Sequence, residues 1–255
     1  MKRSTRGRLL VRSLLVFGLI TTHGFAAGKA DRATCPSGMA LIPGGRYVMG
    51  EGKSENDVKA FCLDITEVRV ADYRRFSSAK RESKNQWVPD VGSCLGDSPA
   101  HEQFPVNCVD WNQATAYCAA QGKRLPTEEE WEWAARGTTK AWKFPWGDKT
   151  PWEESNEPPE GVCWRRPRGD PGCIAGTSQQ DVSPEGIHDL YGSVTEWTSS
   201  AAYRPPDSRR ARGNCAPCTS HVTVTERLTY EPVLAASHLG FRCAATPAAP
   251  KTRAR

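Results

Sequence analysis

The stretch Asp110–Gly137, DWNQATAYCAAQGKRLPTEEEWEWAARG, predicts two helices joined by a tight turn. Asp110 is suited to cap the first helix, and Gln113 stands three residues later, in the reciprocal position of a capping box. Gly122 supplies the left-handed residue at which a helix commonly ends. Three side chains share one face of this helix at helical spacing: Ala114, Tyr117 and Cys118.

The second helix is predicted to start after Thr127 and to end at Gly137. Thr127 and Glu130 form a second capping box, and Glu128 and Glu129 accompany Glu130 at the positive end of the helix dipole. We interpret these three acids as capping groups rather than as catalytic acids or bases.

Three further motifs follow the helix pair: FPWGD (Phe144–Asp148), GIHDLYGSVTEW (Gly186–Trp197) and LGFRCA (Leu239–Ala244). Together with GKRLPTEEEWEWAARG they resemble the formylglycine-generating enzyme, or sulfatase-modifying factor, family, over about Gly38 to Ala244. The resemblance implies an α+β fold of the C-type-lectin-like kind, with short antiparallel strands, a few helices and long ordered loops. Periodicity and cysteine content alone predict only an α+β, loop-rich, disulfide-stapled chain.

Outside the helix pair the predicted elements are short. Strands are expected at 39–42, 46–49 and 61–68, a helix at 70–78, and loops at 50–58, 83–107 and 150–184. Trp142, Phe144 and Trp146 lie close together around Pro145, and such an aromatic cluster is typical of a core or a loop anchor.

The first 27 residues have the composition of a secretory signal peptide. They hold five basic residues and no acid, and the basic region is followed by the apolar run Leu14–Ile20 and by small residues through Ala27. This apolar run is too short to span a bilayer, and no later segment is apolar enough to do so. We therefore expect an exported protein, periplasmic or extracellular, without a membrane span.

Removal of the signal peptide changes the charge balance. The whole chain has a formal net charge of +5, and residues 1–27 contribute five positive charges. The remainder is close to neutral, which argues against nucleic-acid binding. Residues 35–245 are assigned to one sulfatase-modifying-factor-like domain because no linker divides them, and residues 246–255 to a basic Pro/Ala tail expected to be disordered.

The ten cysteines of an exported chain favour disulfides over free thiols. Three pairs are proposed because each closes a local loop: Cys35–Cys62, Cys94–Cys108 and Cys163–Cys173. The family resemblance implies a further disulfide between Cys118 and Cys243, which joins the central helix to the last strand.

The motif GIHDLYGSVTEW carries the candidate metal site. In the family that it resembles, the positions of Asp189 and Glu196 supply carboxylate oxygens to a calcium ion. The positions of Gly192 and Val194 supply backbone carbonyls, and calcium prefers several hard oxygen ligands of this kind. The alternative is structural: Asp189 caps a turn, and Glu196 pairs with an arginine. We expect calcium at this loop.

A second calcium site of the family would begin near Asn156 and Glu157. Its remaining acid is either Asp170 or Asp181. The surrounding residues 150–184 are largely irregular, so the sequence does not choose between these two acids.

The copper chemistry of active family members depends on two cysteine thiolates that bind copper(I) and activate oxygen. Aligned from Arg212 without gaps, Cys218 falls at the first copper ligand and Thr223 at the second. Cys215 falls at the family's active-site serine, and Thr195 at a tryptophan beside the calcium loop. Threonine does not replace a thiolate, so the alignment implies that the copper pair is lost.

Cys215 and Cys218 form a C-x-x-C and are the only catalytic candidates that the sequence offers. In an oxidising compartment they are expected to form a fifth disulfide. Alternatively, Cys215 replaces the missing copper ligand, with His221 as a further donor.

Three functions remain, of which we favour a non-catalytic binding or scaffold module with a calcium loop. The second is a copper- and oxygen-dependent oxidase that converts a protein cysteine to formylglycine. The third is a thiol–disulfide oxidoreductase, although nothing like a thioredoxin βαβ unit surrounds the C-x-x-C. A protein or peptide is the expected partner, and the oligomeric state is left open.

Overall fold

The structure is a computed structural model of the 255-residue chain. It describes residues 33–50, 52, 55–80, 94–95, 99–150, 161–164, 170, 172–215 and 222–249. The predicted signal peptide therefore lies outside the described residues. So do Asn156 and Glu157, where the family's second calcium site would begin, and also Cys218 and His221.

The helices are α1 (Val70–Lys80), α2 (Trp111–Ala120) and α3 (Glu128–Ala135), with short 3-10 turns η1 (Pro99–His101) and η2 (Thr138–Lys140). Both predicted capping boxes are confirmed. The Asp110 carboxylate accepts the Gln113 amide at 2.7 Å, and the Gln113 side chain accepts the Asp110 amide at 2.9 Å. Thr127 and Glu130 make the same reciprocal pair at the start of α3. No helix among the described residues is long and apolar enough to cross a bilayer.

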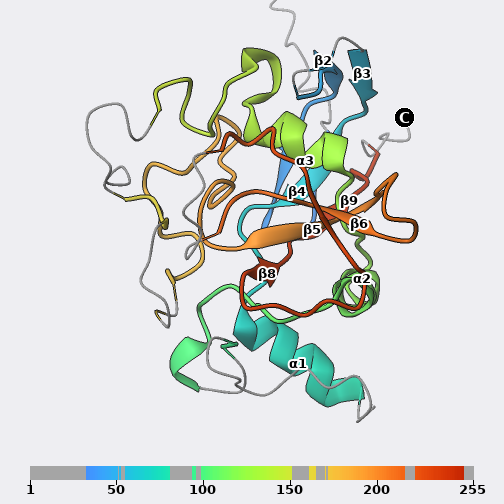
Figure 1. Cartoon of the computed structure of the whole chain (residues 1–255), viewed down its shortest axis with the longest axis vertical. Coiled ribbons are helices and arrows are strands. Elements are labelled where there is room, and N and C mark those ends of the chain that lie inside the picture. The colour runs from blue at the N-terminus through green and yellow to red at the C-terminus, as the bar shows by residue number, and fades with distance from the viewer. Residues whose placement is uncertain are drawn as a thin grey trace, which may run out of the picture. The chain divides into compact units, whose positions relative to one another are not determined.

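The described strands form three small sheets (Figure 1). The four-stranded sheet has the order β7-β6-β5-β8, with β5 (Thr195–Ala201), β6 (Arg209–Arg212), β7 (Leu228–Tyr230) and β8 (Leu239–Gly240). The three-stranded sheet has the order β1-β4-β9, with β1 (Met39–Ile42), β4 (Phe61–Asp64) and β9 (Ala244–Ala245). A hairpin joins β2 (Gly45–Val48) to β3 (Glu55–Val58). The β5–β8 pair is parallel and every other described pair is antiparallel.

Two of the predicted elements differ from the observed ones by more than two residues. Residues 55–58, expected within a loop, form strand β3; only Val58 of this strand is buried, so no apolar alternation marks it. The strand expected at 61–68 ends at Asp64, because the Ile65 amide and carbonyl bond Gly38 and His188, outside the β4 ladder. Of the tail predicted at 246–255, only residues 246–249 are described, and within them the Ala248 amide donates to the Thr34 carbonyl at 2.9 Å.

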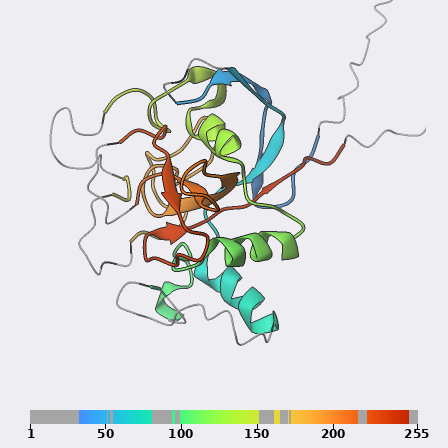
Figure 2. The same cartoon turned by 45° about the vertical axis from the view of Figure 1, so that its right-hand side comes forward.

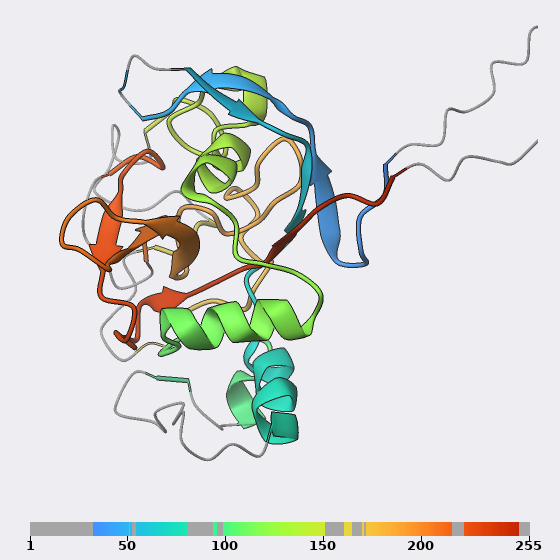
Figure 3. The same cartoon turned by 90° about the vertical axis from the view of Figure 1, so that its right-hand side faces the viewer.

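Two large hydrophobic clusters form the core of the described residues. One packs α1 and α2 against the carboxyl-terminal strands, through Tyr73, Tyr117 and Phe241, whose rings are in mutual contact. Figures 2 and 3 show these two helices together, at the end opposite α3 and the β2–β3 hairpin. The other cluster surrounds α3, with Trp131 and Trp133 buried.

The aromatic cluster near residue 144 belongs to the core around α3. Phe144 is fully buried and stacks on Trp146 at 5.1 Å between ring centroids. Both rings meet Tyr191 edge-on, at 5.4 and 5.3 Å. Because Tyr191 belongs to the GIHDLYGSVTEW motif, this stack anchors the candidate metal loop to the core.

Four disulfides join described cysteines: Cys35–Cys62, Cys94–Cys108, Cys118–Cys243 and Cys163–Cys173. Cys118–Cys243 ties α2 to the residue that precedes β9. The observed architecture is an α+β, loop-rich chain stapled by disulfides. Such staples are typical of exported proteins.

Loss of the Cys118–Cys243 disulfide is expected to destabilise the whole domain. Its cysteines are 125 residues apart, whereas Cys163 and Cys173 are 10 apart, so it restricts the unfolded chain more. We expect Cys118→Ala/Cys243→Ala to lower the free energy of unfolding by about 2–5 kcal/mol. Denaturant unfolding measures this loss. A smaller loss than that of Cys163→Ala/Cys173→Ala would contradict the expectation.

Candidate functional site

The carboxylate of Asp181 shapes the candidate metal loop. It accepts hydrogen bonds from three successive backbone amides, those of Leu190 at 3.2 Å, Tyr191 at 2.8 Å and Gly192 at 2.9 Å. Burial and, after it, the Asp189 charge raise the pKa of Asp181 to about 7, although the donating amides of Gly192 and Tyr191 oppose this shift. The sequence indicated Asp181 only as an alternative acid for a second calcium site; nothing in its spacing pointed to this bonding.

Gly192 is required by a close approach of two backbones. A Cβ atom at this position would lie 2.2 Å from the Cys163 carbonyl oxygen. The same oxygen accepts the Ser193 amide at 2.7 Å, so the Cys163–Cys173 disulfide sits directly against the loop. Asp189 and Ser193 both have left-handed backbone conformations, with φ of 60° and 69°. Non-glycine residues in this region are uncommon and concentrate at functional loops.

Glu196, at the start of β5, is committed to a buried ion pair. Its two carboxylate oxygens accept the Nη2 and Nε atoms of Arg242, each at 2.7 Å. The indole Nε1 of Trp131 also donates to Oε2, at 2.9 Å. Glu196 and Arg242 are both fully buried. The arginine pairing considered for Glu196 is therefore present, and both of its oxygens are engaged.

Arg242 also holds two distant segments together. Its Nη1 donates to the carbonyls of Asp64 at 3.2 Å and Ile65 at 3.3 Å. Its Nη2 donates to the carbonyls of His188 at 2.8 Å and Asp189 at 3.4 Å. Burial lowers the pKa of Arg242, but the charge and hydrogen bonds of Glu196 more than offset this, so the pKa is raised.

Two carboxylates next to this ion pair have unpartnered oxygens. Neither oxygen of Glu67 has a hydrogen-bond partner, and Glu67 is 2% exposed. Asp189 is 1% exposed; its Oδ2 accepts the Gly176 amide, while its Oδ1 has no partner. Burial, followed by the charge of Asp189, raises the pKa of Glu67 well above its ordinary value. The Ser193 hydroxyl lowers this pKa, although its geometry falls short of a hydrogen bond.

These residues form one acidic cluster, which we define as Glu67, Asp181, Asp189 and Glu196 together with Arg242. It places four carboxylates against one guanidinium, and every member is at most 2% exposed. Burying several unbalanced charges is costly unless a proton or a cation neutralises them.

The donor chemistry of this cluster fits calcium in part. The free oxygens of Asp189 and Glu67 are hard, anionic and buried, as calcium ligands should be. Glu196, in contrast, has no oxygen without a partner. No group of three or more His, Cys, Asp or Glu side chains within the described residues is arranged to hold a metal ion. Asp170, the other acid considered for a second site, accepts the Gly172 amide at 2.8 Å.

The segment aligned with the copper site leaves β6 through Arg212. This arginine pairs with the buried carboxylate of Glu132. Cys215 is buried and disulfide-bonded. The four disulfides between described cysteines leave Cys218 as the remaining cysteine, and it lies outside the described residues. Thr223, aligned with the second copper ligand, has its hydroxyl 2.6 Å from that of Thr225.

Residues 25–247 match the model of the sulfatase-modifying factor enzyme 1-like domain. The chain belongs to this family. The inactive C-alpha-formylglycine-generating enzyme 2 of Mus musculus is 33% identical over 84% of this chain and 87% of its own length. The formylglycine-generating enzyme of Thermomonospora curvata is 34% identical over 61% of this chain and 59% of its own length.

The fold of this sulfatase-modifying-factor domain is also that of a solved structure. CarF aligns with a TM-score of 0.63, covering 83% of this chain and 98% of its own, at 18% identity. At that identity the likeness concerns the fold alone. It confirms the formylglycine-generating-enzyme fold that the four sequence motifs predicted.

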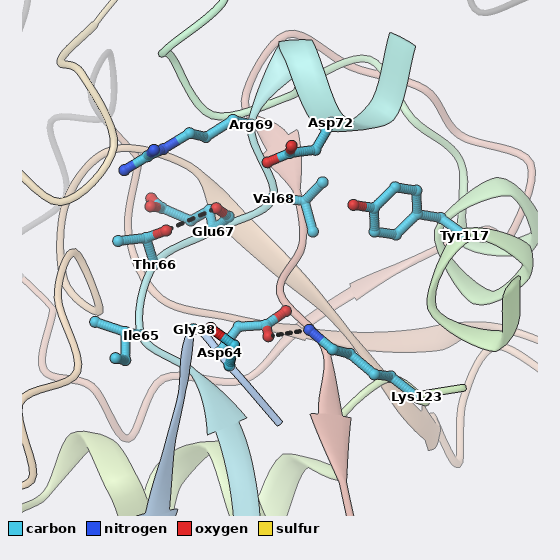
Figure 4. A pocket seen from close by; sticks show the side chains of 11 residues that line it. Gly38, Asp64, Ile65, Thr66, Glu67, Val68, Arg69, Asp72, Tyr117 and Lys123 are labelled. Carbon is cyan, nitrogen blue, oxygen red and sulfur yellow. Dashed lines mark hydrogen bonds and ion pairs between the residues drawn. The ribbon is translucent and has the colours of Figure 1, made fainter. Parts of the chain in front are cut away.

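A pocket of about 440 Å³ is lined by residues 64–69, which include Glu67, and by Asp72, Tyr117 and Lys123 (Figure 4). Among its charged side chains, Lys123 pairs with Asp64 at 2.6 Å, Asp72 pairs with Arg75, and Arg69 donates to the Gln103 side chain at 3.3 Å. In Figure 4 the Glu67 side chain points away from Tyr117 and Lys123, and both of its carboxylate oxygens are buried.

Removing Arg242 is expected to destabilise the domain strongly. Arg242→Met leaves Glu196 buried and uncompensated, which should cost about 3–5 kcal/mol of unfolding free energy. The double variant Arg242→Met/Glu196→Leu should recover part of that loss. Arg46→Met, in an exposed pair with Glu55, is the control, with an expected loss of about 0–1 kcal/mol.

Denaturant unfolding in chelator measures all three variants of this comparison. Equal losses for Arg242→Met and Arg46→Met would contradict a structural role for the buried pair.

Proposed function

We propose that this chain is a non-catalytic member of its family that acts by binding. The observation that carries the proposal is the state of the aligned copper position. Thr223, with its hydroxyl 2.6 Å from that of Thr225, stands where the second thiolate is needed, and copper(I) selects soft thiolates. Cys215, which aligns with the family's active-site serine, is oxidised in a disulfide.

The relatives support this reading without deciding it. The mouse relative is named inactive and aligns over most of both chains, whereas the Thermomonospora relative is named for the activity and aligns over a smaller share. Both outcomes therefore occur in the family at similar identity. The residues at 215 and 223 favour the inactive one.

We also propose that calcium binds the loop 189–196. The buried, unpartnered Oδ1 of Asp189 supports this, as does the negative excess of the acidic cluster. The Gly192 and Val194 carbonyls would be further ligands, as the family resemblance implies. Glu196 is the fourth implied ligand, but both of its oxygens accept hydrogen bonds from Arg242 and Trp131. Calcium would supply charge neutralisation and fix the loop.

We propose that the protein acts in the periplasm or outside the cell. Four disulfides among the described cysteines support an oxidising compartment. A protein or peptide is the proposed partner, held by loops that vary independently of the scaffold. The thiol–disulfide oxidoreductase alternative gains no support from the surroundings of Cys215, which is 1% exposed.

The purified protein is expected not to convert a sulfatase-type cysteine peptide to formylglycine with copper and oxygen. An active family enzyme serves as the positive control, and mass spectrometry of the peptide is the measurement. Turnover by this chain, lost on Cys218→Ser, would overturn the non-catalytic proposal. Peptide binding without turnover would support it.

A gain-of-site variant sharpens this test. Cys215→Ser/Thr223→Cys restores the residue types that the family alignment implies and frees Cys218 from its C-x-x-C partner. We expect this variant to bind copper(I) in competition with a chelator, whereas the wild type does not. Equal copper(I) binding by both proteins would contradict the reading of Thr223 as a lost ligand.

Calcium is expected to stabilise the folded chain. Binding to the folded state alone should add about 2.7 kcal/mol at a hundred times the dissociation constant. Asp189→Asn should abolish this gain because it removes an anionic oxygen ligand. Asp170→Asn is the control and should retain it. Identical thermal unfolding in calcium and in chelator would contradict the calcium proposal.

A further inference from the structure

We propose that Glu67 supplies the second carboxylate of the cation site at Asp189. Glu196, to which the family resemblance assigns that role, has both of its oxygens engaged by Arg242. The inference rests on the proposed calcium loop and identifies a ligand outside it. Glu67 lies between β4 and α1, more than a hundred residues from the loop, and is not among the four ligand positions that the family resemblance implies.

The fold brings Glu67 to the loop through two sets of contacts. Arg242 donates to the carbonyls of both Ile65 and Asp189, so it fixes the two segments side by side. On the other side of Asp189, the Gly176 amide donates to Oδ2. A Cβ atom on Gly176 would lie 2.8 Å from the Thr66 side chain, so the residue before Glu67 also packs here.

Glu67 lies within reach of the loop, because the Ser193 hydroxyl lowers its pKa and the Asp189 charge raises it. Ser193 lies between Gly192 and Val194, whose carbonyls are the proposed backbone ligands. Both oxygens of Glu67 and the Oδ1 of Asp189 are buried without a partner. Three anionic oxygens are therefore available at this point, and none comes from Glu196.

The charges point the same way. Arg242 is the only cationic side chain of the acidic cluster, and both oxygens of Glu196 already engage it. The Asp181 carboxylate accepts hydrogen bonds from three backbone amides. Glu67 and Asp189 thus remain as two interacting, buried carboxylates with unpartnered oxygens. A divalent cation between them would balance both charges and give their free oxygens a partner.

The test is a calorimetric calcium titration of the full chain after metal removal with chelator. Glu67→Gln keeps the shape of the side chain but removes its charge, and should weaken calcium binding at least about tenfold, because affinity follows ligand charge. Asp64→Asn is the matched control on the same segment. Its carboxylate is already satisfied by Lys123 and the Cys243 amide, so calcium affinity should be unchanged.

Metal-free stability gives a second readout. Removing one of two interacting buried charges should raise the unfolding temperature of metal-free Glu67→Gln above that of metal-free wild type. Calcium should then raise it no further, whereas the wild type still gains. Glu67→Asp, which keeps the charge on a shorter side chain, should bind with intermediate affinity.

The outcomes separate the two proposals. Calcium binding by wild type and by Glu67→Gln with equal affinity would overturn the assignment of Glu67 and leave the calcium loop standing. No binding by wild type would overturn both. A Glu67→Gln variant that is less stable than metal-free wild type and is still stabilised by calcium would also contradict the inference.

Discussion

The buried ion pair between Arg242 and Glu196 is the interaction on which the rest of the structure depends. It joins β5 to the carboxyl-terminal segment, and the Trp131 indole adds α3 to the same carboxylate. The remaining donors of Arg242 hold the end of β4 against the loop at 188–189. Since a buried pair is favourable only when its donors and acceptors are satisfied, this guanidinium fixes the relative positions of four chain segments.

This arrangement also explains why the candidate metal loop carries unbalanced charge. Glu196 and several carbonyls engage the guanidinium, and Asp181 engages the amides of the loop, so oxygens of Glu67 and Asp189 are left without a partner. The segment aligned with the copper site differs from the calcium loop in lacking the ligand that the family places there. Asn214 donates its amide to Tyr191 of the loop, and the next residue, Cys215, is disulfide-bonded. Thr223, aligned with the second copper ligand, bonds Thr225 instead of offering a thiolate.

The sequence predicted what depends on neighbouring residues. Both capping boxes are local patterns, and the disulfides that close short loops follow from adjacency. Strand β3 was missed because its burial does not alternate. Pairing of Arg242 with Glu196, 46 residues away, and the orphaned oxygens of Glu67 have no local signal, since they arise only when packing removes water from several segments at once.

The most direct test of this account is an anomalous difference map from crystals soaked with terbium in place of calcium. The account predicts one peak between the carboxylates of Glu67 and Asp189, with Arg242 still paired to Glu196. A peak bound by Glu196 with Arg242 turned away, or no peak at this loop, would contradict it.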